Sequence, residues 1–230
     1  MMTLDRTPRT RVQRIIKMYV VPYLHEKGFH KPGRSYCRRL GQLLHIAKIS
    51  PSSINNRDKY GFGVTVGIHI PFVIAHFWKR PEPPSDMKIL PEHGLVHCAP
   101  SLILVPRHAQ EWEIRSEDAP EKDIEVGHDI RSVIEEGAFS RFFDRFQHPS
   151  DVANFLSRAR SNADQQISPA KLNMCNVYAG IIWDQLGESQ KCKECLRRAV
   201  ELTKGKRLEA DIEHFARKYV CGKLPRIASS

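Results

Sequence analysis

The chain has 230 residues, of which 41% are hydrophobic and 27% are charged, and its formal net charge is +10. A chain of this length and composition can bury a core, which excludes a disordered or low-complexity protein. The most apolar window, GIHIPFVIAHFW, is interrupted by His69, Pro71 and His76 and falls short of the roughly 20 apolar residues that span a membrane. No apolar secretory segment follows the arginine-rich N-terminus, so we expect a cytoplasmic protein without a membrane partner.

The charge is distributed unevenly along the chain. Residues 1–60 hold 13 Lys or Arg against 3 Asp or Glu, and residues 61–129 hold 6 against 11. Residues 130–230 are basic again, with 17 against 12. The basic ends predict either a polyanionic partner or contact with the acidic middle of the chain, which would neutralise them.

A change in hydrophobic period separates a first helix from a sheet. Apolar residues recur every three or four positions over residues 8–28, where Pro22 is expected to kink the helix and Gly28 to end it. From residue 34 the period becomes two. The sequence predicts about four to six antiparallel strands with one core face. The other face is nearly bare in GFGVTVGIHI, where it carries Gly63, Thr65, Gly67 and His69.

The rest of the chain is predicted to change from strands to helices. LVHCAPSLILVP and EWEIRS have strand character, residues 79–94 form an excursion off the sheet, and residues 116–129 form a solvated loop. After Asp129 the chain is predicted to be helical. Ser168 and Pro169 begin one of these helices, Gly187 ends it, and another runs from about residue 189 to 204.

The junction between the first helix and the sheet carries a recognisable pattern. A GF pair ends the helix, a KPGRSY turn leads into a strand, a later strand reads VTVG, and a cysteine precedes a tryptophan-containing strand. Over about residues 8–156 this order resembles the bacterial family called domain of unknown function 4304. The residues that carry the resemblance are Gly28, Phe29, Lys31, Gly33, Arg34, Tyr36, Val64, Val66, Gly67, Cys98 and Trp112. Members often have an arginine-rich stretch after the cysteine, where this chain has APS, and the family has no assigned activity. The resemblance therefore implies a fold and no site.

One C-terminal stretch, CNVYAGIIWDQLGESQKCKECLRRAVEL, is similar to a single tetratricopeptide repeat. Asn176 stands where the repeat has its first tryptophan, and Lys204 stands where it has a proline. A lone copy cannot bury its own face, so we expect this hairpin, at about residues 175–204, to pack with its flanking helices as a docking surface or a buttress. The matching small and aromatic positions are Gly180, Trp183, Gly187, Leu196 and Ala199.

The predicted fold class is therefore α+β, with an N-terminal helix, an antiparallel sheet and a C-terminal helical segment that contains the repeat-like hairpin. We divide the chain into an α+β domain, residues 1–148, and a helical segment, residues 149–230, packed on the first.

No motif predicts a catalytic or cofactor site. The sequence lacks GxSxG, GxxxxGK and GxGxxG patterns, and we expect no cofactor. The histidine cluster HGLVHC has the closest ligand spacing, but a strand would turn Cys98 away from His97. Cys192 and Cys195 share a helical face without a second CxxC. We therefore expect no metal site, and the six cysteines are predicted to be reduced and mostly buried.

The candidate binding residues lie in the first strands. Neighbours in a strand point to opposite faces, so Arg38 and Arg39 cannot share one platform. The first prediction is a non-catalytic protein-interaction module with an unknown protein partner. Two alternatives stay open: nucleic-acid or polyanion binding through the basic N-terminal third, and a metal-assisted hydrolase that uses the histidine cluster. The candidate residues are Arg34, Arg38, Arg39, His45, Thr65, Gly67 and His69.

Overall fold

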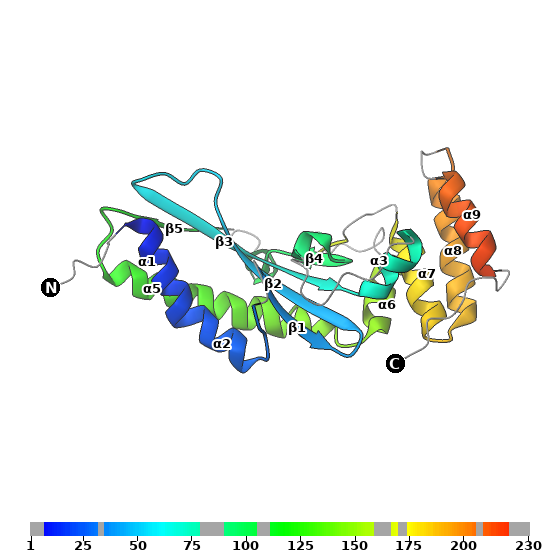
Figure 1. Ribbon diagram of the computed structural model, residues 1–230, viewed down its shortest axis with the longest axis horizontal. Helices are drawn as coiled ribbons and strands as arrows, with labels where there is room; N and C mark the ends of the chain where they lie inside the picture. Colours follow the sequence, from blue (N-terminus) through cyan, green and yellow to red (C-terminus); the bar gives the residue numbers. More distant parts are fainter. Residues whose placement is uncertain are drawn as a thin grey trace.

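The fold is α+β, as the sequence predicts (Figure 1). The N-terminal helix and the helix that follows the fifth strand lie along one face of an antiparallel sheet, and the C-terminal helices stand beyond one end of it. Within the parts of the chain described below, no helix is both long and apolar enough to cross a membrane. The computed structural model describes residues 7–31, 35–78, 90–104, 111–158, 167–169, 174–205 and 209–220.

Among the described residues the sheet has six antiparallel strands, the last of only two residues. The order is β1-β2-β3-β4-β6, and β5 pairs with the first part of β3. The longest pairing joins β2 to β3, from Leu44 opposite His69 to Pro51 opposite Phe62. The predicted number of strands is confirmed. Their bounds are β1 Tyr36–Leu40, β2 Leu43–Pro51, β3 Lys59–His69, β4 Val96–Cys98, β5 Trp112–Arg115 and β6 Ser168–Pro169.

The N-terminal helix is interrupted where the sequence predicts a kink. A π-helical stretch, η1 Ile16–Val20, separates α1 Pro8–Ile15 from α2 Val21–Glu26. Pro22 stands in the first turn of α2, where it has no N–H to donate, and the wider π turn before it makes room for the proline ring. Gly28 follows the helix with a φ of +79°, which confirms its predicted role at the helix end.

The prediction of a solvated loop over residues 116–129 is wrong, because α5 Glu121–Ser132 is a helix that packs on η1. Asp123 in its first turn favours a helix N-terminus and binds arginines of α1. The ring of Tyr19 lies so close to Gly127 that a Cβ there would overlap it. The acidic composition suggested solvation, whereas the helix pairs its buried acid and covers an apolar face.

Two other predicted elements are wrong. The segment after Cys98 is a helix, α4 Pro100–Leu104, instead of a strand, because proline suits a first helical turn and cannot donate to a strand ladder. Ser168 and Pro169 form β6 instead of beginning a helix, and the next described helix begins at Cys175.

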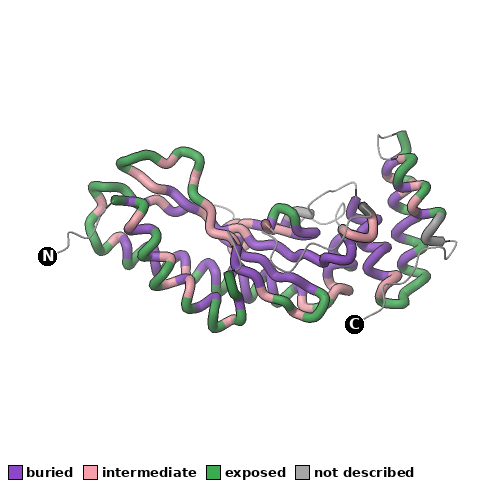
Figure 2. The backbone as a smooth tube through the Cα atoms, viewed as in Figure 1, coloured by how far each residue is buried: buried purple, intermediate pink, exposed green. Residues whose placement is uncertain are grey.

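The core lies between the inner face of the sheet and the helices, as the buried segments in Figure 2 show. Val64, Val66 and Ile68 of β3 are buried on this face, so the predicted alternation of that strand is confirmed. The remaining helical elements before α6 are α3 Pro71–Trp78, η3 Val133–Ser140 and η4 Phe143–Arg145.

The outer face of the sheet is only partly bare. The predicted excursion at residues 79–94 lies mostly outside the described residues, but its end forms a 3-10 turn, η2 Pro91–His93. A Cβ on Gly67 would be 2.8 Å from the carbonyl oxygen of Pro91, so glycine is required by the close approach of this turn. A second, small apolar cluster on the same face consists of Cys37, Leu44 and Ile46.

The C-terminal segment contains a helical hairpin formed by α7 and α8, as predicted. Gly187 stands between them with a φ of +79°, and Gly180 lets Leu196 approach α7 closely. One apolar core runs from the sheet into this segment, and the rings of Phe146 and Phe155, 5.6 Å apart, lie where the two parts meet. The division at residue 148 stays a prediction. The helices are α6 Pro149–Arg158, α7 Cys175–Gln185, α8 Ser189–Thr203 and α9 Glu209–Val220.

Candidate functional site

The binding residues predicted from the sequence lie on both faces of the sheet. Arg38 is opposite His45 in the β1–β2 register, and both side chains point to the inner face. Arg34 lies outside the described residues. The structure therefore separates the candidates into two groups on opposite faces of the sheet. The outer-face group consists of Arg39, Thr65, Gly67 and His69.

His45 is fully buried and is held by two hydrogen bonds. Its Nε2 donates to the carbonyl of Phe146 at 3.0 Å, so its Nδ1 is unprotonated and accepts from Nη2 of Arg38, also at 3.0 Å. The ring stacks on Phe143 with the ring centres 4.8 Å apart. Burial, with the charge of Arg38, lowers the pKa of His45 to about 4. The histidine ties β2 to η4 as a neutral group that solvent does not reach.

The outer-face group is also largely covered. Arg39 is exposed and Thr65 is half-buried, but His69 is only 4% exposed. Burial lowers the pKa of His69 to about 4, so it is uncharged at neutral pH. Because η2 covers Gly67, a ligand on this face would reach, of these four candidates, the exposed arginine and part of the threonine.

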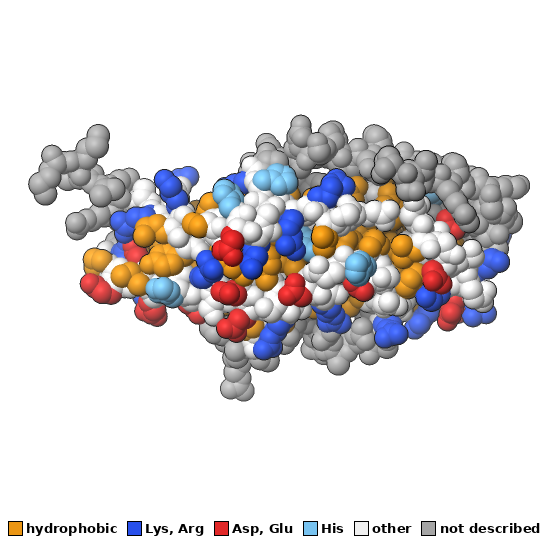
Figure 3. Space-filling view, turned by 90° about the horizontal axis from the view of Figure 1, so that it is seen from below, with side chains coloured by type: hydrophobic (Ala, Val, Ile, Leu, Met, Phe, Trp, Pro, Cys, Tyr) orange, Lys and Arg blue, Asp and Glu red, His pale blue; other side chains and the backbone are white. Residues whose placement is uncertain are grey.

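Several cations of the basic N-terminal third contact acids from the middle of the chain. Arg11 and Arg14 of α1 lie 2.7 and 2.6 Å from the carboxylate of Asp123, and Lys48 lies 3.1 Å from Glu92. Figure 3 shows basic and acidic side chains interspersed on the face seen from below. Contact with the acidic middle is one of the two predicted meanings of the charge pattern, and it leaves fewer cations for a polyanion.

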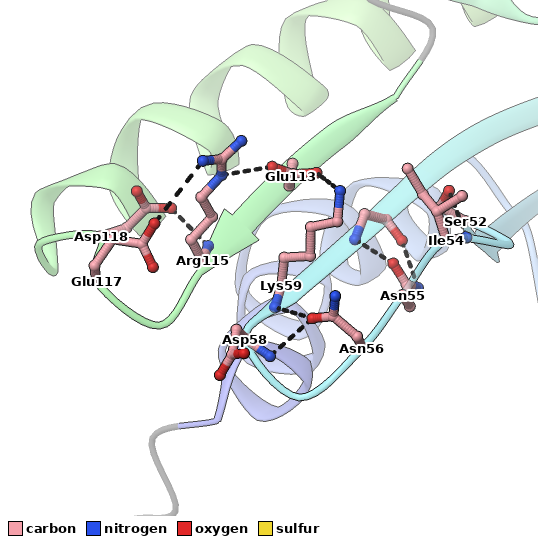
Figure 4. A network of polar contacts seen from close by, with 11 residues as sticks. Ser52, Ile54, Asn55, Asn56, Asp58, Lys59, Glu113, Arg115, Glu117 and Asp118 are labelled. Carbon is pink, nitrogen blue, oxygen red and sulfur yellow. Dashed lines mark hydrogen bonds and ion pairs between the residues drawn. The ribbon is translucent and has the colours of Figure 1, made fainter.

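A further polar network closes the end of the β2–β3 hairpin (Figure 4). Glu113 of β5 accepts a hydrogen bond from Arg115 at 2.7 Å and lies 3.4 Å from Nζ of Lys59. Asn55 donates to the carbonyl of Gly61 at 2.9 Å and accepts from its N–H at 2.6 Å. These contacts hold the hairpin loop and its neighbouring strand in place, so their role is structural.

The histidine and cysteine clusters have little capacity for chemistry. Within the described residues, no group of three or more His, Cys, Asp or Glu side chains could hold a metal ion. Cys98 is buried in the core while His97 lies opposite Gly67 on the outer face, which confirms that the two diverge. Burial raises the pKa of Cys192 to about 12 and that of Cys195 to about 11. Both thiols are therefore protonated and unreactive at neutral pH.

A cleft of about 240 Å³ opens between α6, α7 and α8. Each helix contributes one stripe of side chains to it, because the lining residues recur at spacings of three, four or seven. On α8 this stripe runs from Lys191 to Arg198. We call this feature the α6–α8 cleft, and it is lined by Asn154, Ser157, Arg158, Asn176, Trp183, Lys191, Glu194, Cys195 and Arg198.

Asn176 is the buried polar side chain of the α6–α8 cleft. It is 6% exposed, and its Oδ1 has no hydrogen-bond partner. A buried polar atom left without a partner costs about 1–3 kcal/mol. The oxygen itself is covered, so a ligand N–H reaches it only when neighbouring side chains move aside, and the new hydrogen bond would then remove that cost.

The α6–α8 cleft is also positively charged. Three of its lining side chains are cationic and one, Glu194, is anionic. Nζ of Lys191 lies 4.4 Å from the ring centre of Trp183, and Nη1 of Arg198 donates to the carbonyl of Ser157 at 3.5 Å. The second of these contacts is long and bridges α8 to α6, so a stronger acceptor could replace it.

The sequence reasoning missed this cleft. Its residues come from three helices, and each stripe taken alone is typical of a solvated helix face. The available signal was Asn176, a polar residue inside the apolar run CNVYAGIIW at the repeat position of a tryptophan.

Comparisons with known proteins do not assign the chain to a family, because no protein-family model, no curated protein and no solved structure matches it. The resemblance to domain of unknown function 4304 and the similarity to a tetratricopeptide repeat stay predictions from the sequence. The function must therefore be argued from the residues of this chain.

Proposed function

We propose that the chain is a non-catalytic protein-interaction module that binds a peptide segment of a partner in the α6–α8 cleft. The observation that carries the proposal is Asn176, a residue of the cleft lining whose buried Oδ1 has no hydrogen-bond partner. The cleft has a volume of about 240 Å³, below the roughly 300–1,000 Å³ of small-molecule sites, so it suits one or two side chains of a partner segment that lies across it.

The two alternatives have less support. For a polyanion, Arg11, Arg14 and Lys48 are already paired with carboxylates. For a metal-assisted hydrolase, the described residues offer no ligand group. Elution of the chain from heparin only at high salt would favour the polyanion alternative over the interaction module.

A displayed library of random peptides, selected on the full chain, tests the proposal. Enriched peptides are synthesised and titrated by calorimetry against the unmodified chain and two variants. Ser157→Tyr places a ring in the cleft, whereas Ser189→Tyr adds the same ring at the exposed start of α8, outside the lining. We expect micromolar binding that Ser157→Tyr abolishes and Ser189→Tyr preserves. Failure to enrich any sequence, or equal binding to both variants, would contradict the proposal.

A further inference from the structure

The charges and hydrogen-bonding groups of the α6–α8 cleft define the chemistry of its ligand. We infer, on the basis of the proposed function, that the cleft selects a peptide segment with a glutamate or aspartate side chain. Its carboxylate pairs with Arg198 and Lys191, and a main-chain N–H beside it donates to Oδ1 of Asn176.

The charge of the cleft lining favours an anionic ligand. Lys191 and Arg198 face the same cleft with one acid, Glu194, so these three side chains carry a net charge of +1. The structure shows no ion pair between Glu194 and Arg198, although they stand four residues apart on α8. A guanidinium whose strongest contact is a 3.5 Å hydrogen bond to a carbonyl would gain by binding a carboxylate with two parallel hydrogen bonds.

Lys191 stands about two turns before Arg198 on the same stripe. Its Nζ lies 3.4 Å from Glu188 and above the ring of Trp183, and these two contacts hold the ammonium at the edge of the cleft. The pair with Glu188 is exposed, since both side chains are about half accessible. Exposed pairs contribute only about 0–1 kcal/mol, so a ligand carboxylate can compete for this ammonium.

The acceptor atom of Asn176 favours a ligand that also carries a hydrogen-bond donor. An amide oxygen accepts hydrogen bonds and cannot donate them, so an anion alone would leave Oδ1 unpartnered. A peptide supplies both groups, because it carries a main-chain N–H at every non-proline residue, with at most about 3.6 Å between residues. The phosphodiester groups of a nucleic-acid backbone supply the charge without that donor. The lining therefore favours an acidic peptide over a bare polyanion.

The test uses three pools of seven-residue peptides, acetylated and amidated so that only side chains carry charge. The fixed central residue is Glu, Gln or Lys, the other positions vary among uncharged residues, and a fluorescent label reports binding by anisotropy. We expect the Glu pool to bind about tenfold more tightly than the Gln pool, the size of one charge-assisted hydrogen bond. The Lys pool should bind most weakly.

Two charge reversals on adjacent residues provide the matched control. Arg198→Glu should remove the preference for the Glu pool. Arg197→Glu should preserve it, because Arg197 is exposed, pairs with Glu201 at 3.9 Å and is absent from the lining. Circular dichroism checks that both variants fold.

The possible outcomes distinguish a failure of this inference from a failure of the proposed function. If all three pools bind equally and Ser157→Tyr abolishes binding, the inference is overturned and the interaction module stands. If no pool binds, both are overturned. If a single-stranded oligonucleotide competes with the Glu pool as effectively as unlabelled peptide does, and Arg198→Glu abolishes its binding, the cleft is a polyanion site and the inference fails.

Discussion

Replacing His45 by glutamine should flatten the acid sensitivity of the fold. Below a pH of about 6.5 an unfolded chain protonates this histidine, whereas the folded chain holds it neutral until the pH approaches its lowered pKa of about 4. The unfolded state therefore binds more protons in this window, and the free energy of unfolding falls as the pH falls. Each pKa unit corresponds to about 1.4 kcal/mol, so His45 alone removes about 3 kcal/mol by pH 4.

Urea unfolding at pH 7 and at pH 4 measures this contribution of His45 to the free energy of unfolding. The glutamine variant can still donate to the carbonyl of Phe146 but does not titrate, so we expect it to be less stable than the parent chain at pH 7. The difference should shrink or reverse by pH 4. His69 and the exposed histidines are common to both proteins, so their contributions cancel. A constant difference between the two proteins at the two pH values would refute the lowered pKa of His45 and the burial that causes it.

Three other predictions follow from single contacts. Gly67→Ala should cost about 1–3 kcal/mol of stability in urea, because the new methyl group overlaps the backbone of η2; an unchanged midpoint would contradict that approach. Arg11→Met should cost about 3 kcal/mol of stability by the same assay, since it removes a buried partner of Asp123. The control, Arg115→Met at an exposed ion pair, should cost less than about 1 kcal/mol. Equal losses in the two variants would count against the buried pair. Iodoacetamide at pH 8 should modify Cys195 far more slowly in the folded chain than in urea, because burial raises its pKa to about 11; equal rates, followed by mass spectrometry, would show that the thiol is accessible.

Local patterns predicted the parts of the fold that depend on local chemistry. The alternation of β3, the disturbance at Pro22 and the turn at Gly187 were visible because strand period, proline and glycine act on their own neighbours. Helix α5 was missed because the partners of its acidic residue lie more than 100 residues away, as Arg11 does from Asp123. A charged residue is predicted to be solvent-exposed when its partner in the fold cannot be recognised from the sequence.

The candidate site was hidden for a similar reason. The seven predicted residues belong to one stretch of strands, but the pleat divides those that the structure describes, with His45 inside and Arg39 outside. The α6–α8 cleft assembles three stripes, and only the packing of α7 between its neighbours shows that Asn176 is buried without a partner. A polar residue in an apolar helical run was its one trace in the sequence.

The most direct test of the proposed site is a titration of the isotope-labelled chain with a Glu-centred peptide, followed by nuclear magnetic resonance. Signals from the side-chain amide of Asn176 and the indole N–H of Trp183 should shift, together with backbone signals of α8 near Arg198. Shifts confined to β1 and β3 around Arg39 and Thr65, with the cleft signals unmoved, would place the ligand on the sheet and contradict the account.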